Sequence, residues 1–145
     1  MGKGKKSFDE VHLNAFTTKV LGSADQLYRF VYATVLDLDM SFKVVRHVID
    51  ESTNKIDMIY GSPEFEVRKY LFKECWVELQ KHKATSDSTV TKQLGKLAKL
   101  PTETRAAVIL TDCMGFRMEE AAGILDIKGD GLINDIVEAR QALIS

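Results

Sequence analysis

The residues of this chain best placed to bind a partner lie in its last third, in segment 100–143. There, two amphipathic stretches flank a short turn with glycine, which predicts a helix-turn-helix. The second helix of such a motif enters the DNA major groove and gains affinity from Lys and Arg. Segment 129–143 instead carries three acids and one base: Asp130, Asp135, Glu138 and Arg140. We therefore expect a DNA-reading scaffold whose surface lacks the charge for DNA.

The apolar residues of this last helix follow two lines. The spacing of one line suits packing onto the lobe: Leu132, Ile136, Ala139 and Leu143. Ile133 and Val137 lie off that line. They either widen the core face, which is the commoner case, or form a face that binds a protein. The residues that we predict to bind a protein are Leu132, Ile133, Asp135, Ile136, Val137 and Glu138.

A nucleic-acid interface is the alternative. In it, Lys128, Asn134 and Arg140 contact duplex DNA. An opened strand would then meet basic and aromatic residues of an earlier helix, namely Arg68, Lys69, Tyr70, Phe72, Lys73 and Trp76. A tryptophan in such an apolar helix more often belongs to the core than to a stacking platform.

Composition excludes several classes of protein. The chain has 145 residues, 45% hydrophobic and 28% charged, typical of an ordinary soluble globular protein. No window approaches 18 continuous apolar residues and no signal peptide is recognisable, so we expect a cytoplasmic protein without a membrane span. The cysteines and histidines lack metal-ligand spacing, and no phosphate loop or nucleophile elbow occurs. We expect no metal, no cofactor, no small-molecule substrate and no enzymatic activity.

Helical periodicity is widespread and no strand pattern is convincing, so the sequence predicts an all-α fold. The expected helices cover residues 8–20, about 24–36, 41–51, 62–83 and, weakly, 89–99. Pro63 and Pro101 are expected in the first turns of helices. The residues expected on buried faces are Leu27, Phe30, Val31, Val35, Phe42, Val45, Ile49, Phe65, Tyr70, Leu71, Cys75, Trp76 and Leu79.

The chain divides into two predicted helical lobes joined by a linker. The boundaries are a flexible arm at 1–7, a lobe at 8–83, a linker with a weak helix at 84–99, and a helix-turn-helix lobe at 100–145. Charge is divided unevenly along the chain. Residues 1–99 carry 16 Lys and Arg against 13 Asp and Glu, whereas residues 100–145 carry 4 against 8. A free-standing DNA-binding domain normally shows the opposite balance at its reading head.

Several motifs are similar to those of bacterial sigma factors of the extracytoplasmic-function group. LPTETRAAVIL resembles the opening helix of region 4, GFRMEEAAGILDI its first helix-turn-helix helix, and GLINDIVEARQAL its recognition helix. GF followed by EEAA is similar to alphaproteobacterial general-stress sigma factors and to the sigma-like domain of their response regulators. LYRFVYATVL and FKVVRHVIDE are similar to region 2 in pattern. The resemblance implies two helical lobes that act in transcription.

The departures from the family pattern point to proteins as partners. Where the family has an acidic and Gln-rich set that grips the polymerase clamp, this chain has Lys43, Arg46 and His47. Where the recognition helix of the family usually has Thr, Lys, Ser, Arg and a further basic residue, this chain has Gly131, Ile133, Asn134, Asp135 and Glu138. We therefore expect a sigma-factor-like regulator that contacts an anti-sigma factor, RNA polymerase or an activator, with DNA binding possible but weak. The alternatives are a divergent but genuine sigma factor and a helical interaction module unrelated to transcription.

Overall fold

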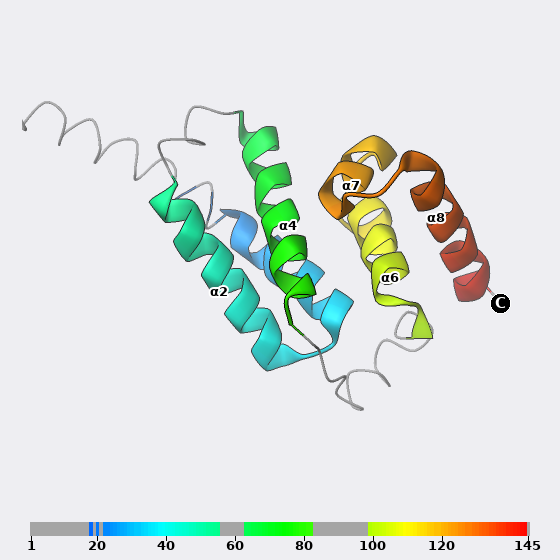
Figure 1. The fold of residues 1–145 in the computed structure, drawn as a ribbon, viewed down its shortest axis with the longest axis horizontal. Helices are drawn as coiled ribbons and strands as arrows, with labels where there is room; N and C mark the ends of the chain where they lie inside the picture. Colours follow the sequence, from blue (N-terminus) through cyan, green and yellow to red (C-terminus); the bar gives the residue numbers. More distant parts are fainter. Residues whose placement is uncertain (1–17, 19, 21, 56–62, 83–98, 145) are drawn as a thin grey trace, which may run out of the picture.

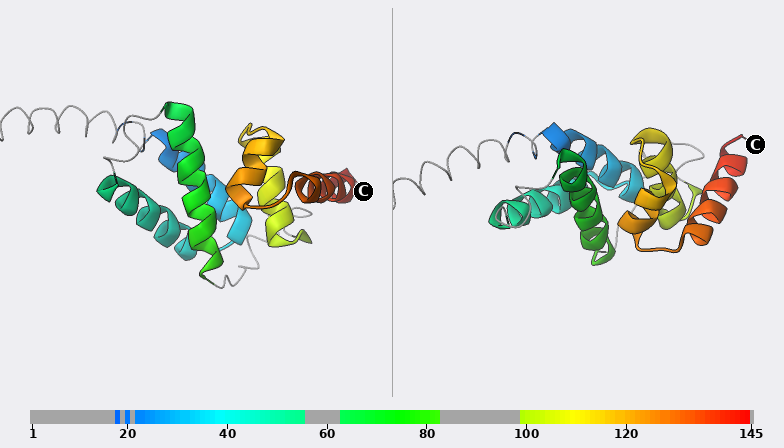
Figure 2. Two further views of the ribbon diagram at one scale, coloured as in Figure 1. Left: turned by 45° about the horizontal axis from the view of Figure 1, so that its top comes forward. Right: turned by 90° about the horizontal axis from the view of Figure 1, so that it is seen from above.

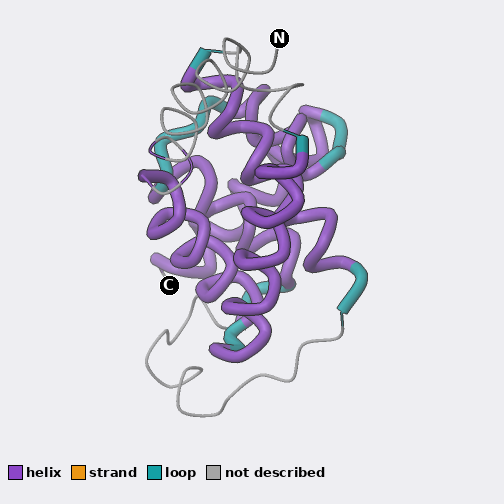
Figure 3. The backbone as a smooth tube through the Cα atoms, turned by 90° about the vertical axis from the view of Figure 1, so that its left-hand side faces the viewer, coloured by secondary structure: helices purple, strands orange, loops and turns teal. Residues whose placement is uncertain are grey.

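The computed structural model describes residues 18, 20, 22–55, 63–82 and 99–144. These residues are mostly helical, and the trace in Figure 3 shows no strand among them. The fold is all-α, as the periodicity predicts. A search of the described residues finds no helical stretch with the length and hydrophobicity of a membrane span.

The N-terminal lobe consists of three helices: a helix over residues 22–35, α2 (Leu38–Asn54) and α4 (Glu64–Gln80). The apolar stripe predicted for the first helix is confirmed, because all four of its members are buried: Leu27, Phe30, Val31 and Val35. α2 contacts α4. Together these faces enclose the core of the lobe.

A tight bend separates the first helix from α2. Leu36 has a φ of 60°, a left-handed conformation that is unfavourable for a residue other than glycine. Its side chain is fully buried, so packing holds the bend. Asp37 then caps α2, because its Oδ1 accepts a hydrogen bond from the Met40 N–H at 3.0 Å.

The C-terminal lobe consists of α6 (Thr102–Val108), the π-helical turn η2 (Ile109–Cys113), α7 (Met118–Leu125) and α8 (Gly129–Ile144). The Arg117 N–H at the start of α7 donates to Glu120 Oε1 at 2.8 Å. α7 and α8 form the predicted helix-turn-helix. The turn itself contains no glycine, however, because Gly129 already belongs to α8 and Asp126 takes the left-handed position.

The two lobes pack against each other and share one hydrophobic core (Figure 1). α4 lies between α2 and the C-terminal lobe and contacts α7 (Figure 2). The rings of Phe72 in α4 and Phe116 before α7 meet edge to face, with their centroids 5.0 Å apart. Arg68 stacks over Phe116 and donates from Nη2 to the Met114 carbonyl at 2.7 Å. These contacts join segments more than 40 residues apart in sequence.

A second arginine joins the lobes from the other side. Arg105 in α6 is buried, and its Nε donates to the Thr34 carbonyl at 3.0 Å. Its Nη2 also donates to Thr34, and its Nη1 donates to the Leu100 carbonyl at 2.8 Å. The end of the first helix is therefore fixed to the start of α6.

Some expectations about the helices were wrong. Phe42 and Phe65 were expected to be buried, but both are exposed. Pro63 and Pro101 lie at the N-cap positions of α4 and α6, one residue before the first turn. The predicted arm at 1–7, nearly all of the helix at 8–20 and nearly all of the linker at 84–99 lie outside the described residues.

Candidate functional site

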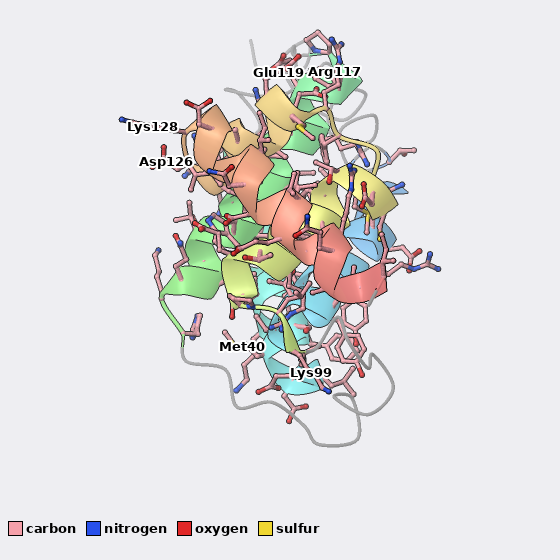
Figure 4. The ribbon with its side chains drawn as sticks, turned by 90° about the vertical axis from the view of Figure 1, so that its right-hand side faces the viewer. Met40, Lys99, Arg117, Glu119, Asp126 and Lys128 are labelled. Atoms are coloured by element: carbon pink, nitrogen blue, oxygen red, sulfur yellow. The ribbon has the colours of Figure 1, made fainter. Side chains whose placement is uncertain are left out.

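The core side of α8 determines which residues of this helix face outward. Leu132, Ile136 and Ala139 are fully buried against the rest of the lobe. The turn before α8 is held by the Ile127 N–H, which donates to the Ala122 carbonyl at 3.1 Å. With the buried side fixed, the opposite side of α8 is free to meet a partner (Figure 4).

Ile133 and Val137 do not widen the core face. Their exposed fractions are 45% and 48%, and Ile144 at the end of the helix is also exposed. Residues four and eleven apart lie on the same side of an α-helix, so these three side chains follow one line along α8. An exposed line of branched apolar side chains favours contact with a protein.

Two of the predicted protein-binding residues are buried. Leu132 and Ile136 were expected to contact a partner, but the lobe itself buries them completely. A partner therefore cannot reach them while the lobe stays folded. Their role in α8 is packing, as their spacing with Ala139 indicates.

The acidic residues of α8 extend around the helix from one side of the apolar line, and Asp135 lies opposite it. Asp130 and Glu138 are exposed, and Asp135 is half-buried on the side of α8 that faces α6. Burial raises the pKa of Glu103 in α6, and the charge of Asp135 and a hydrogen bond to it raise that pKa further. Two carboxyl groups therefore meet where α6 contacts α8, and this pairing favours the protonated form of Glu103.

The one basic residue of α8 is already engaged. Arg140 donates to Asp112 with two nitrogens, Nη2 to Oδ1 at 2.6 Å and Nε to Oδ2 at 3.3 Å. In this two-point ion pair, Asp112 offsets the guanidinium charge of Arg140 that would otherwise attract a phosphate. The pair lies between Val137 and Ile144 on the apolar line, so the line is neutral at this point. This pair could not be predicted from local spacing, because its members are 28 residues apart.

The two aromatic residues that the nucleic-acid alternative requires for base stacking are not accessible. Phe72 and Trp76 are buried in the core shared by the lobes and cannot receive an unpaired base. Arg68 is committed to Phe116 and Met114, and the Tyr70 hydroxyl donates to Glu74 at 3.3 Å. Of this alternative set, the residues that remain exposed are Lys73 on α4, Lys128 before α8, and Asn134 and Arg140 on α8.

The exposed cations of this alternative set come from both lobes. Lys73 belongs to the N-terminal lobe, whereas Lys128 lies at the beginning of α8, with its side chain directed away from the body of the molecule (Figure 4). Lys69 is half-buried and lies against Gly123 of α7. The structure therefore places exposed apolar residues on one line of α8, with Lys128 just before this helix and Lys69 and Lys73 on α4.

The described residues offer no constellation for metal chemistry. Glu78 lies near two imidazoles, with His82 Nε2 at 3.0 Å and His47 Nε2 at 3.6 Å. Lys81 Nζ lies 3.4 Å from the same carboxylate. Within the described residues no group of three or more His, Cys, Asp or Glu could hold a metal ion. The Glu78 cluster is an ion-pair network on the surface of the N-terminal lobe.

Comparison with known proteins finds solved structures with a similar fold. No protein-family model matches the sequence, and no curated protein matches it. Two similar solved structures are the sigma factor RpoE in complex with the anti-sigma factor NepR from Bartonella quintana, and CnrH in complex with the cytosolic domain of CnrY. The TM-scores are 0.71 and 0.74, each at 20% sequence identity. The matches cover 89% and 90% of this chain, and 94% and 85% of the other chains. The resemblance to extracytoplasmic-function sigma factors is therefore confirmed at the level of the fold.

Proposed function

We propose that this chain is a sigma-factor-like regulator of bacterial transcription that acts in the cytoplasm, mainly through protein contacts. The outer face of α8 binds an anti-sigma factor, a surface of RNA polymerase or an activator. Ile133 and Val137 supply the apolar contacts, and the exposed Glu138 selects the partner by charge, whereas Asp135 faces α6 and lies away from these two residues. One observation carries this proposal: the recognition-helix position presents exposed apolar side chains in a helix rich in carboxylates, and its only arginine is paired with Asp112.

Electrostatics argues against DNA as the main ligand of this face. A helix in the major groove lies close to two lines of phosphates, and each neutralised phosphate contributes to affinity through counterion release. α8 carries three carboxylates and one paired guanidinium. Its approach to a duplex would therefore bring like charges together and release few counterions.

The fold supports the class of partner. Both similar structures are complexes with a second protein, and in one of them the second protein is named as an anti-sigma factor. The described structure gives no support to base stacking on Phe72 or Trp76, on which the genuine sigma-factor alternative relied for the opened strand.

The contribution of the apolar contacts can be worked from exposure. Covering the exposed half of Ile133 or Val137 is worth about 1 kcal/mol each. Replacing both by serine should therefore cost about 2 kcal/mol of binding energy, or about 30-fold in affinity. Val77 on α4 offers a matched control, because it is 40% exposed and lies in the other lobe.

The test is capture of partners from a bacterial lysate on three immobilised proteins: the parent chain, the double variant Ile133→Ser/Val137→Ser, and Val77→Ser. We expect an anti-sigma-like protein, polymerase or an activator to bind the parent and Val77→Ser, and to be lost on the double variant. If polymerase core is recovered and the chain then directs it to a promoter, the result would favour the genuine sigma factor. Recovery of none of these proteins would favour a module unrelated to transcription.

DNA binding is measured in parallel with purified protein. Phosphate-driven binding weakens steeply between about 50 mM and about 200 mM salt, whereas apolar docking changes little. Tight binding of a promoter duplex at physiological salt, without any partner protein, would contradict the proposal.

A further inference from the structure

The π-helical turn η2 connects the outer face of α8 to the contact between the lobes. It continues α6 directly and closes with the Met114 N–H, which donates to the Ile109 carbonyl at 2.9 Å. The Phe116 N–H then donates to the Leu110 carbonyl at 3.0 Å. A π-helical turn holds one residue more than an α-helical turn, and such turns often lie at functional sites.

The residues that follow η2 make the contact with the N-terminal lobe. Arg68 of α4 donates from Nη2 to the Met114 carbonyl at 2.7 Å, and its guanidinium carbon lies 4.2 Å from the centre of the Phe116 ring. If η2 were wound as an α-helix, these residues would shift by one helical position, about 1.5 Å along the axis and about 100° around it. The Met114 carbonyl and the Phe116 ring would then turn away from Arg68. This contact between the lobes therefore depends on the winding of η2.

An ion pair joins η2 to α8. Arg140 of α8 holds Asp112 of η2 through two nitrogens, at 2.6 Å and 3.3 Å, and the two side chains are 50% and 38% exposed. Arg140 follows Ile133 by seven residues and precedes Ile144 by four, so it lies on the exposed apolar line of α8. A protein that covers this line therefore also covers the ion pair.

Covering the ion pair makes it harder to open. On an exposed surface such a pair opens at little cost, because water hydrates each charge once they separate. Under an apolar partner the attraction is less screened, and opening would leave two buried charges without compensation. Asp112 is then held in place, and the winding of η2 is held with it.

We propose that η2 couples the outer face of α8 to the contact between the lobes, so that a protein bound over Ile133 and Val137 holds Arg68 on Met114 and Phe116. The coupling rests on the proposed function, because it takes the outer face of α8 as the binding surface. It gives this surface a regulatory role, since an occupied α8 keeps the two lobes in one arrangement. By linkage, weakening the contact between the lobes weakens binding of the partner by the same factor.

Amide hydrogen exchange in the full chain tests the coupling without any partner. The reporters are the Met114 and Phe116 amides, and the references are the Ile127 and Leu132 amides, which are hydrogen-bonded at the other end of α8. Asp112→Asn removes the ion pair and keeps the size of the side chain. We expect exchange of the reporters to accelerate by about 2- to 5-fold and exchange of the references to stay unchanged.

Two further variants and a control separate the ion pair from a general loss of stability. Arg140→Gln should accelerate the reporters by the same factor as Asp112→Asn. The double variant should accelerate them by no more than either single change, because all three lack the same pair. Asp25→Asn is the matched control, since it breaks an exposed ion pair with Arg29, at 3.2 Å, in the N-terminal lobe. It should leave reporters and references unchanged.

The direction of the coupling is tested with the protein that the lysate experiment captures on the parent and loses on Ile133→Ser/Val137→Ser. Its addition should slow exchange of the reporters in the parent chain, and faster exchange would overturn the proposal. Unchanged reporters in Asp112→Asn, or equal acceleration of reporters and references, would overturn it as well and leave binding at α8 standing. If the lysate yields no such protein, the proposed function fails, whereas the exchange pattern of the chain alone still decides the coupling.

Discussion

The packing of the two lobes can be tested at Arg68, which links α4 to the segment before α7. Replacing it by methionine keeps much of the apolar stem but removes the hydrogen bond to the Met114 carbonyl and the stacking on Phe116. A hydrogen bond from a charged donor contributes about 1.5–3 kcal/mol. A partly desolvated cation–π contact adds about 0.5–2 kcal/mol. Burial lowers the pKa of Arg68 while the charge of Glu120 opposes that shift, so part of this gain offsets desolvation.

We therefore expect Arg68→Met to lower the free energy of unfolding by about 2–4 kcal/mol. Urea denaturation followed by circular dichroism measures this change, and the slope of the transition reports whether the lobes still unfold together. Lys73→Met on the same helix is the control, because Lys73 is exposed. A loss below about 0.5 kcal/mol, equal to that of Lys73→Met, would show that these contacts do not hold the lobes together.

Two further predictions concern pH. The hydrogen bond from His82 and the neighbouring Lys81 and His47 lower the pKa of Glu78 against an opposing effect of burial. The stabilisation that ionised Glu78 contributes is present above the ordinary pKa of 4.5 and is lost as pH falls through the lowered pKa. Glu78→Gln should therefore lower the free energy of unfolding at neutral pH and leave it equal to that of the parent in acid. Burial and the neighbouring Asp135 raise the pKa of Glu103. The stabilisation that protonated Glu103 contributes is therefore present below pH 4.5 and is lost as pH rises through the raised pKa. Glu103→Gln should raise the melting temperature at neutral pH and leave it unchanged in acid; the reverse pattern in either variant would contradict the assigned cause.

Periodicity predicted the helices because their buried faces recur with the helical repeat. The stripe from Leu27 to Val35 is the clearest case, and the packing side of α8 is another. The helix-turn-helix followed from the same pattern. Its turn could not be predicted in detail, since a left-handed Asp126 takes the place of the expected glycine.

Periodicity could not predict how far each apolar face is covered. Phe42 and Phe65 lie on helix faces that contain buried neighbours, yet no described element covers them fully. In the opposite sense, Leu132 and Ile136 were expected to be available to a partner and are enclosed by the lobe. Burial depends on the elements that pack across a helix, and one helix's sequence does not contain that information.

Contacts between distant residues were also beyond the sequence. The bond from Arg105 to Thr34 spans 71 residues, and the pair of Arg140 with Asp112 spans 28. Neither has a local spacing that could predict it. The second pair bears on the candidate site, because it sets a carboxylate against the one cation of α8. The acidic character of α8 could be predicted from composition, and this pairing strengthens it.

Photo-crosslinking at Val137 is the most direct test of the claim that α8 binds a protein. A photoreactive amino acid is placed at Val137 in bacterial cells, and at Val77 as the control, and the adducts are separated after irradiation. Our account predicts an adduct at Val137 with a defined polypeptide that the Val77 position does not capture. If the crosslinked group at Val137 is removed by nuclease and not by protease, it is nucleic acid, and this result would contradict the claim.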